Sequence, residues 1–180
     1  MPNFGDWHPG DIVLVHAQAS PVGKLLRAGQ RLSRNELMRA GSDCTHAGIY
    51  VGNGVMVDAN RRSGVSACSV WDFCQFRSLQ LRRVKDAAIP AERVAEIASK
   101  AATHIGEPYS VVEVLLAKLG WSDAQRPDPQ ALYCSTFVGL VVTEATDVEL
   151  GSDPAHQPLF PAILASHPDL HDVFLEWRNF

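Results

Sequence analysis

The 180-residue sequence predicts an α+β fold, because strand-like segments fill much of its first half and helix-like segments much of its second. The apolar run 12–15 follows the turn Pro9-Gly10-Asp11 and fits a buried strand. The segment 45–52 (THAGIYVG) is a second strand, which carries a histidine. The residues Gly52-Asn53-Gly54 indicate a hairpin to a third strand at 55–60. Cys134 begins an apolar helix that reaches about residue 144.

Further strands are expected at 64–70 and 78–84, and further helices at 21–40, 90–105 and 111–119, with a polar loop at 120–130. In the first helix, the spacing of apolar residues places these side chains inward: Val22, Leu25, Leu26, Leu32 and Leu37. Five basic residues face outward: Lys24, Arg27, Arg31, Arg34 and Arg39. A solvated helix face is the simpler interpretation of this basic cluster, and contact with a substrate or an anionic surface is the alternative.

The length of the loop in the 45–60 hairpin decides which side chains meet. If Gly52, Asn53 and Gly54 all form the loop, Gly48 lies opposite Asp58 and His46 opposite Asn60. His46, Asp58 and Asn60 then project from one face of the sheet. A two-residue loop would instead put Asp58 on the other face from His46.

Composition excludes several classes of protein. The length and the 46% of apolar residues fit one domain, residues 1–180. The net charge of −4 offers no footprint for nucleic acid. The four cysteines show no CxxC spacing, so free thiols in a reducing compartment are the simpler interpretation. No apolar run reaches membrane-spanning length and the start lacks the pattern of a signal peptide, so we expect a chain that is cytoplasmic as synthesised.

Cys134 and His46 have the chemistry of a nucleophile and its base. A thiol has a pKa of about 8.5 and is mostly protonated at neutral pH, so a nucleophilic cysteine needs help. Cys134 lies at a helix start, where the helix dipole favours a thiolate and backbone N–H groups can receive an oxyanion. His46 can take the proton and return it to a leaving group, with Asp58 or Asn60 orienting its other ring nitrogen.

Five motifs resemble the NlpC-type papain-like cysteine hydrolases. They are Pro9-Gly10-Asp11-Ile12-Val13, the segment 46–54 (HAGIYVGNG), Val57-Asp58-Ala59, the segment 105–109 (IGEPY) and the segment 133–138 (YCSTFV). Because the histidine module comes first and the cysteine helix last, the order is similar to that of the circularly permuted branch typified by YiiX and YebB. The resemblance spans residues 9–145 and implies a permuted papain-like fold, in which a small antiparallel sheet packs against a helical bundle.

The resemblance also implies roles for individual residues. Cys134 would be the nucleophile, His46 the base and Asp58 the orienting acid, although the permuted branch usually has a glutamate at the third position. Tyr109 matches the family tyrosine near the nucleophile, and Tyr133 and Asn60 are the other expected substrate contacts. No cofactor is implied. Cys44 and His46 lack a third ligand at a plausible spacing, so we expect no metal.

The activity implied is hydrolysis of an amide through an acyl-enzyme intermediate, with peptidoglycan stem peptides or related small peptides as substrates. One alternative is a lipid acyltransferase or thioesterase of the lecithin retinol acyltransferase type, which shares the histidine-before-cysteine order. Another is a binding domain without turnover. Because no signal peptide is seen, a cell-wall substrate suggests, by analogy, an antibacterial effector delivered by a specialised secretion system and paired with an immunity protein.

Overall fold

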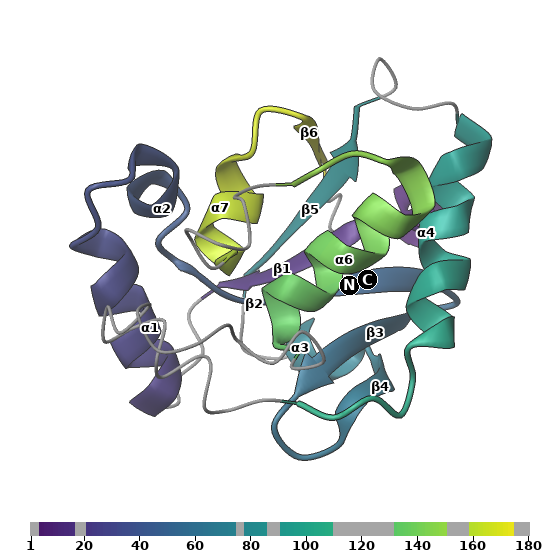
Figure 1. The fold of residues 1–180 in the computed structure, drawn as a ribbon, viewed down its shortest axis with the longest axis horizontal. Helices are drawn as coiled ribbons and strands as arrows, with labels where there is room; N and C mark the ends of the chain where they lie inside the picture. Colours follow the sequence, from purple (N-terminus) through teal and green to yellow (C-terminus); the bar gives the residue numbers. More distant parts are fainter. Residues whose placement is uncertain are drawn as a thin grey trace, which may run out of the picture.

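A six-stranded antiparallel sheet forms the centre of the molecule (Figure 1). The structure is a computed structural model and describes residues 4–16, 21–74, 78–85, 91–109, 132–150 and 159–174. Its strands are β1 (Ile12–His16), β2 (Cys44–Gly52), β3 (Val55–Asn60), β4 (Gly64–Ser69), β5 (Leu79–Val84) and β6 (Leu170–Val173). They are ordered β4-β3-β2-β1-β5-β6. The first five were predicted from the sequence and are confirmed within two or three residues at their ends, whereas β6 was not predicted.

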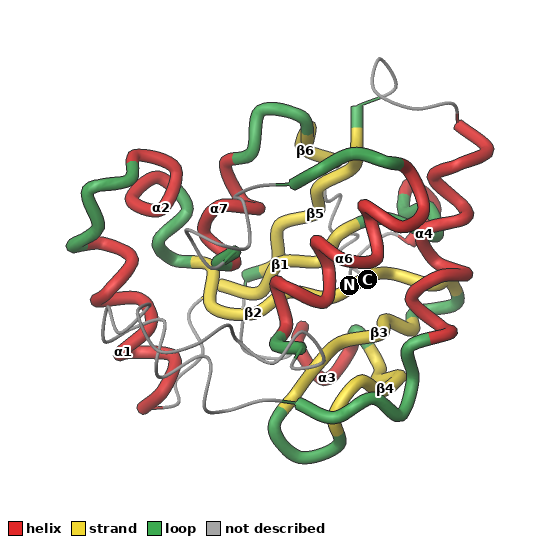
Figure 2. The backbone as a smooth tube through the Cα atoms, viewed as in Figure 1, coloured by secondary structure: helices red, strands yellow, loops and turns green. Residues whose placement is uncertain are grey.

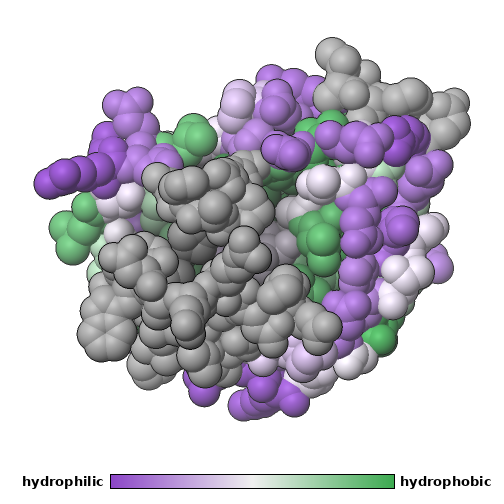
Figure 3. All heavy atoms as spheres, viewed as in Figure 1, coloured by the Kyte–Doolittle hydropathy of each residue, from purple (hydrophilic) through white to green (hydrophobic). Residues whose placement is uncertain are grey.

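Helices cover one face of this sheet and create the larger core. They are α4 (Ala91–Thr103), α6 (Cys134–Thr146) and α7 (Pro161–Ser166), and all three contact β2 (Figures 1 and 2). The helix α6 has an apolar face turned to the sheet, with Phe137, Val138 and Val141 completely buried. Hydrophilic residues lie over α4, and apolar ones show beside them over α6 (Figure 3). Burial of this apolar surface is the main stabilising contribution to the fold.

The opposite face of the sheet carries a second, smaller core. Trp7, beside the short 3-10 helix η1 (Phe4–Asp6), packs edge-on against Tyr50 with ring centroids 5.1 Å apart. The short helix α3 (Trp71–Cys74) adds Phe73 to the same cluster. The sequence did not predict α3, because four residues show no helical period.

The helix predicted over residues 21–40 is wrong as a single element. The structure has α1 (Pro21–Arg31) and α2 (Glu36–Ala40) with a break between them. Asn35 causes the second start, since its Oδ1 accepts the backbone N–H groups of Leu37 and Met38 at 2.9 and 3.3 Å. An asparagine at this position satisfies N–H groups that have no partner within the helix.

The inward face of α1 also differs from the prediction. Leu26 and Leu37 are half-buried, but Leu25 and Leu32 are 61% and 85% exposed. A buried polar side chain of α1 is that of Gln30, whose Nε2 donates to the carbonyl oxygens of Ser42 and Cys44 at 3.0 and 2.9 Å. Hydrogen bonds to the start of β2 therefore set the rotation of α1, and an apolar count cannot detect them.

The basic residues of α1, α2 and the break between them are largely exposed. Arg27 and Arg31 both pair with Asp43, and Arg39 pairs with Glu36. These side chains are at least about one-third exposed, so the pairs contribute little to stability. The predicted helix 111–119 and loop 120–130 lie outside the described residues. Among the described residues, no helix is long and apolar enough to cross a membrane.

Replacing Gln30 by alanine tests the tie between α1 and β2. Gln30→Ala removes three buried hydrogen bonds and leaves two carbonyl groups and the Ala162 N–H without their partner, so we expect the free energy of unfolding to fall by about 1–3 kcal/mol. Chemical denaturation measures this change. Leu32→Ala is the control on the same segment, because an exposed side chain should change stability by less than about 0.5 kcal/mol. Equal effects of the two substitutions would contradict the assignment.

Candidate active site

A bulged hairpin sets the register of the two strands that carry the candidate base and acid. The turn contains two residues, Asn53 and Gly54, both with positive φ. A register shift between Tyr50 and Gly52 then adds one residue to β2, so Gly48 lies opposite Asp58. The predicted pairing of Gly48 with Asp58 is confirmed. The three-residue loop from which we derived it is wrong, because the bulge and not the loop supplies the extra residue.

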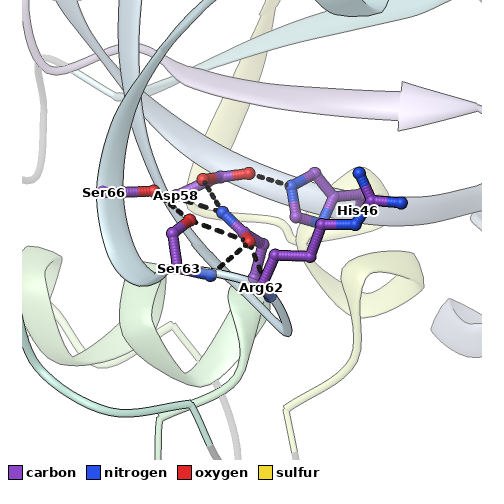
Figure 4. Close-up of polar contacts among 6 residues, drawn as sticks. His46, Asp58, Arg62, Ser63 and Ser66 are labelled. Atoms are coloured by element: carbon purple, nitrogen blue, oxygen red, sulfur yellow. Dashed lines mark hydrogen bonds and ion pairs between the residues drawn. The ribbon is translucent and has the colours of Figure 1, made fainter.

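His46 and Asp58 meet within this hairpin. His46 Nε2 lies 2.6 Å from Asp58 Oδ2, and both side chains are buried (Figure 4). A ring with Nε2 bound to the carboxylate keeps Nδ1 for another partner. Of the two candidate orienters, Asp58 and Asn60, the structure therefore places Asp58 on the imidazole.

Gly48 lies beside this diagonal contact, at a close approach of β2 and β3. Asp58 lies directly opposite Gly48, whereas His46 is two residues further along β2. A methyl group on Gly48 would lie 2.3 Å from Met56 Cε, 2.9 Å from the carbonyl oxygen of Val57 and 3.2 Å from Asp58 Cβ. The missing side chain therefore lets β3 pack closely against β2 where Asp58 approaches His46.

Cys134 is the first residue of α6 and lies beside His46. Its side chain is buried, and its hydrogen bond to His46 contributes to the pKa of the imidazole. Tyr133 is the N-cap residue, and its backbone N–H donates to Thr136 Oγ1 at 2.9 Å. Ser135 Oγ donates to the carbonyl oxygen of Leu159 at 2.6 Å, which fixes the same turn. The helix start is thus held in place by bonds that do not involve the thiol.

The imidazole of His46 is strongly stabilised in its protonated form. Burial alone lowers the pKa of His46, but hydrogen bonds and negative charge from Asp58 and Cys134 outweigh it and raise the pKa to about 10. The ring of Phe73 stacks on the imidazole, with centroids 5.4 Å apart and an angle of 17° between the planes. A charged imidazolium between a carboxylate and a thiol is the arrangement that favours a thiolate.

The other three cysteines are poor nucleophiles. Burial raises the pKa of Cys44 and of Cys68 to about 12 in each case, with a further contribution from Asp43 and from Asp58 respectively. Burial also raises the pKa of Cys74. These thiols therefore stay protonated at neutral pH.

The predicted substrate contacts have different surroundings. Tyr109 is half-buried, and burial followed by the charge of nearby Cys134 raises its pKa, so the phenol lies close to the nucleophile. Tyr133 is buried at the start of α6. Asn60 bonds to Asp58 and to its own turn (Figure 4). That these three residues bind substrate stays a prediction.

The sequence missed three residues that touch the pair. Gly48 was placed opposite Asp58 but given no role, Phe73 lies on an unpredicted helix, and Cys68 was expected only to be a free thiol although it bonds to Asp58. The hairpin register could have placed Cys68 near Asp58, because Met56 pairs with Cys68 and Asp58 with Ser66. No group of three or more possible metal ligands is found in the described part of the chain.

Comparison with known proteins establishes the class. The sequence model of a family described as permuted papain-like amidase enzymes (YaeF/YiiX, C92 family) matches residues 6–160. The match covers most of the chain, and the chain belongs to this family. It is therefore a cysteine hydrolase of the papain-like class, and the predicted permuted α+β fold is confirmed.

A solved structure supports the same fold. A crystal structure of the metalloprotein YiiX from Escherichia coli O157:H7 superposes with a TM-score of 0.62 at 19% sequence identity, covering 95% of this chain and 98% of that chain. At this identity the likeness concerns the fold alone. No curated protein matches the chain.

Replacing Gly48 by alanine tests whether the close approach of β2 and β3 at this position is needed for activity. In Gly48→Ala the new methyl group collides with Met56 Cε and the carbonyl oxygen of Val57 and crowds Asp58 Cβ, so β3 must shift and we expect a loss of activity of at least about tenfold. Hydrolysis rates of the variant and the wild type measure this loss. Gly29→Ala is the control, because nothing lies within 4 Å of a methyl group there. Wild-type activity in Gly48→Ala would show that the hairpin does not need this space.

A titration of His46 tests the electrostatics of the pair. Histidine-labelled protein followed by NMR should show His46 protonated well above the ordinary value of about 6.5, and Asp58→Asn should lower its pKa. Because the folded-state pKa is raised, this pair stabilises the fold fully below about pH 6.5 and loses that contribution as the pH rises toward 10. If the pKa of His46 were the same in Asp58→Asn as in the wild type, Asp58 would not be the group that stabilises the protonated imidazole.

Proposed function

We propose that the protein hydrolyses an amide bond of a peptide through a thioester acyl-enzyme, with Cys134 as nucleophile, His46 as general base and acid, and Asp58 as the orienting group. The observation that carries this proposal is the buried His46–Asp58 hydrogen bond of 2.6 Å beside a cysteine at a helix start. Each of the three groups has the neighbour that its role requires.

The first half of the reaction forms the acyl-enzyme. His46 takes the proton of the Cys134 thiol through Nδ1, while Nε2 stays bound to Asp58. The thiolate attacks the carbonyl carbon, and the oxygen becomes negative. Backbone N–H groups in the first turn of α6 have no acceptor within the helix and are suited to stabilise this oxyanion. The C–N bond then breaks, and His46 returns the proton to the leaving amine.

The second half regenerates the enzyme. His46 takes a proton from a water molecule, the oxygen of which attacks the thioester carbonyl carbon. The C–S bond breaks, the acid product leaves, and the proton on His46 returns to the Cys134 sulfur. Asp58 is neither consumed nor protonated, because it serves to hold the ring and to balance its charge.

Peptidoglycan stem peptides or related small peptides are the proposed substrates. The amidase description of the family supports an amide substrate. The five motifs that resemble NlpC-type hydrolases support peptides of cell-wall type. The neighbouring solved structure is titled a metalloprotein, but the described residues of this chain offer no group of three metal ligands, and our proposal involves no metal.

Mass spectrometry of muropeptides incubated with the purified protein tests the substrate. We expect a defined peptide cut, with new free amino and carboxyl ends at one bond. Release of fatty acid from phospholipid or thioester substrates, with muropeptides left intact, would favour the acyltransferase or thioesterase alternative. Tight binding of peptide without any cut would favour the binding domain.

Two substitutions test the residue roles. Cys134→Ala should abolish turnover, and His46→Ala should lower it by about 10²- to 10⁴-fold, as expected for a lost general base. Steady-state kinetics measure both, and a thermal melt checks that the variants are folded. Cys74→Ala is the matched control, because that thiol lies outside the His46–Asp58 pair. Full activity in Cys134→Ala would exclude the mechanism.

A further inference from the structure

Asn60 binds the carboxylate oxygen of Asp58 that does not bind His46. Its Nδ2 donates to Asp58 Oδ1 at 3.1 Å and to Ser66 Oγ at 3.2 Å (Figure 4). Its Oδ1 accepts the backbone N–H groups of Arg62 and Ser63 at 3.0 and 3.1 Å, and the Ser63 hydroxyl at 3.0 Å. The side chain therefore bridges the Asp58 carboxylate and the turn between β3 and β4.

The partners of Asn60 determine how its carboxamide is turned. The atom facing Asp58 must be a donor, because a carboxylate only accepts, and the atom facing two backbone N–H groups must be an acceptor. Both N–H bonds of the amide are used within the chain. Asn60 thus has no free donor for a substrate, which argues against the substrate contact expected from the sequence.

The two oxygens of Asp58 are consequently held by different residues. Oδ2 binds His46 and Oδ1 binds Asn60, the Cys68 thiol also bonds to the carboxylate, and the side chain is only 1% exposed. A buried carboxylate needs hydrogen bonds to remain ionised, and a second bond also prevents rotation away from the imidazole. Only an ionised, fixed carboxylate supports the imidazolium form of His46.

We propose that Asn60 is a positioning residue for the reaction, which acts through Asp58 to keep His46 protonated and aimed at Cys134. The β3–β4 turn fixes Asn60, Asn60 fixes Asp58, and Asp58 fixes the imidazole. This inference rests on the proposed roles of Cys134, His46 and Asp58. It assigns Asn60 no contact with substrate or with the reacting atoms.

Alkylation of Cys134 by iodoacetamide tests the proposal without any substrate. The rate is followed by mass spectrometry of the peptide that contains Cys134, between about pH 5 and 10. In Asn60→Ala we expect a rate about tenfold lower than wild type near pH 7, the size of a lost hydrogen bond to a charged group. The two rates should converge toward pH 10, where His46 loses its proton and an imidazolium no longer supports the thiolate.

The variant Asn60→Asp distinguishes the effect of losing the hydrogen bond to Asp58 from the effect of disturbing the β3–β4 turn. The new carboxylate still accepts the N–H groups of Arg62 and Ser63, so the turn is kept. At about pH 5 a proton shared between the two carboxyl groups replaces the amide donor, and the rate should be close to wild type. The rate should fall behind wild type as the pH rises to 7, whereas Asn60→Ala should be slow over this whole range.

Asn35→Ala is the matched control, because Asn35 also accepts two backbone N–H groups but lies at the start of α2 and bonds to no residue of the site. Its alkylation profile should equal that of wild type. If Asn60→Ala merely loosens the fold, Cys44 and Cys134 will both react faster, which would overturn the proposal. Wild-type profiles in both Asn60 variants would overturn it as well. Altered profiles in a protein that cuts no amide would contradict the proposed function and leave the role of Asn60 intact.

Discussion

The hydrogen bond between His46 and Asp58 sets the requirements that the surrounding structure meets. Both groups are buried, and a buried charge is costly unless it is paired and hydrogen-bonded. The pair therefore needs a fixed register between β2 and β3, a glycine opposite Asp58, and a second donor for the carboxylate. The bulge at Tyr50–Gly52, Gly48 and Asn60 supply these three conditions.

The cysteine reaches this pair because a second requirement, burial of apolar surface, places α6. Phe137, Val138 and Val141 anchor the helix in the larger core, and they begin only three residues after Cys134. His104 lies edge-on to Phe137, with ring centroids 6.2 Å apart, and also contacts Glu144 further along α6. Packing of the helix body thus determines where its first turn lies. The nucleophile is positioned by the core together with the hydrogen bonds of Tyr133 and Ser135, and the base by its hydrogen bonds and the ring of Phe73.

Local patterns were enough to predict most of the sheet and the helix of the nucleophile. Alternation and turn residues located five strands, and an apolar run after Cys134 located α6. The register of the hairpin was also predicted, although the reason given for it was wrong. A bulge and a longer loop shift the pairing by the same one residue, and a sequence does not distinguish them when Gly52, Asn53 and Gly54 all tolerate positive φ.

Features that depend on distant partners were not predictable in the same way. Gln30 is buried because two carbonyl groups of the following segment need a donor, and Phe73 reaches His46 from a helix too short to show a period. The donor on Asp58 is a similar case. Asn60 was recognised as lying on the same face as His46, but whether it would touch the imidazole, the acid or a substrate depended on the conformation of a turn that begins after it.

That turn also connects the acid to the other side of the site. Gly64 ends it with a φ of +71°, and a side chain there would lie 2.3 Å from the carbonyl oxygen of Glu107. The next residue, Val65, exchanges backbone hydrogen bonds of 2.9 Å with Gly106 and Glu107, just before Tyr109. One short stretch, 60–65, therefore fixes Asp58 through Asn60 and holds the segment that brings Tyr109 close to Cys134. Because both constraints act through backbone and amide groups of one hairpin, the acid and the tyrosine keep their places relative to the nucleophile.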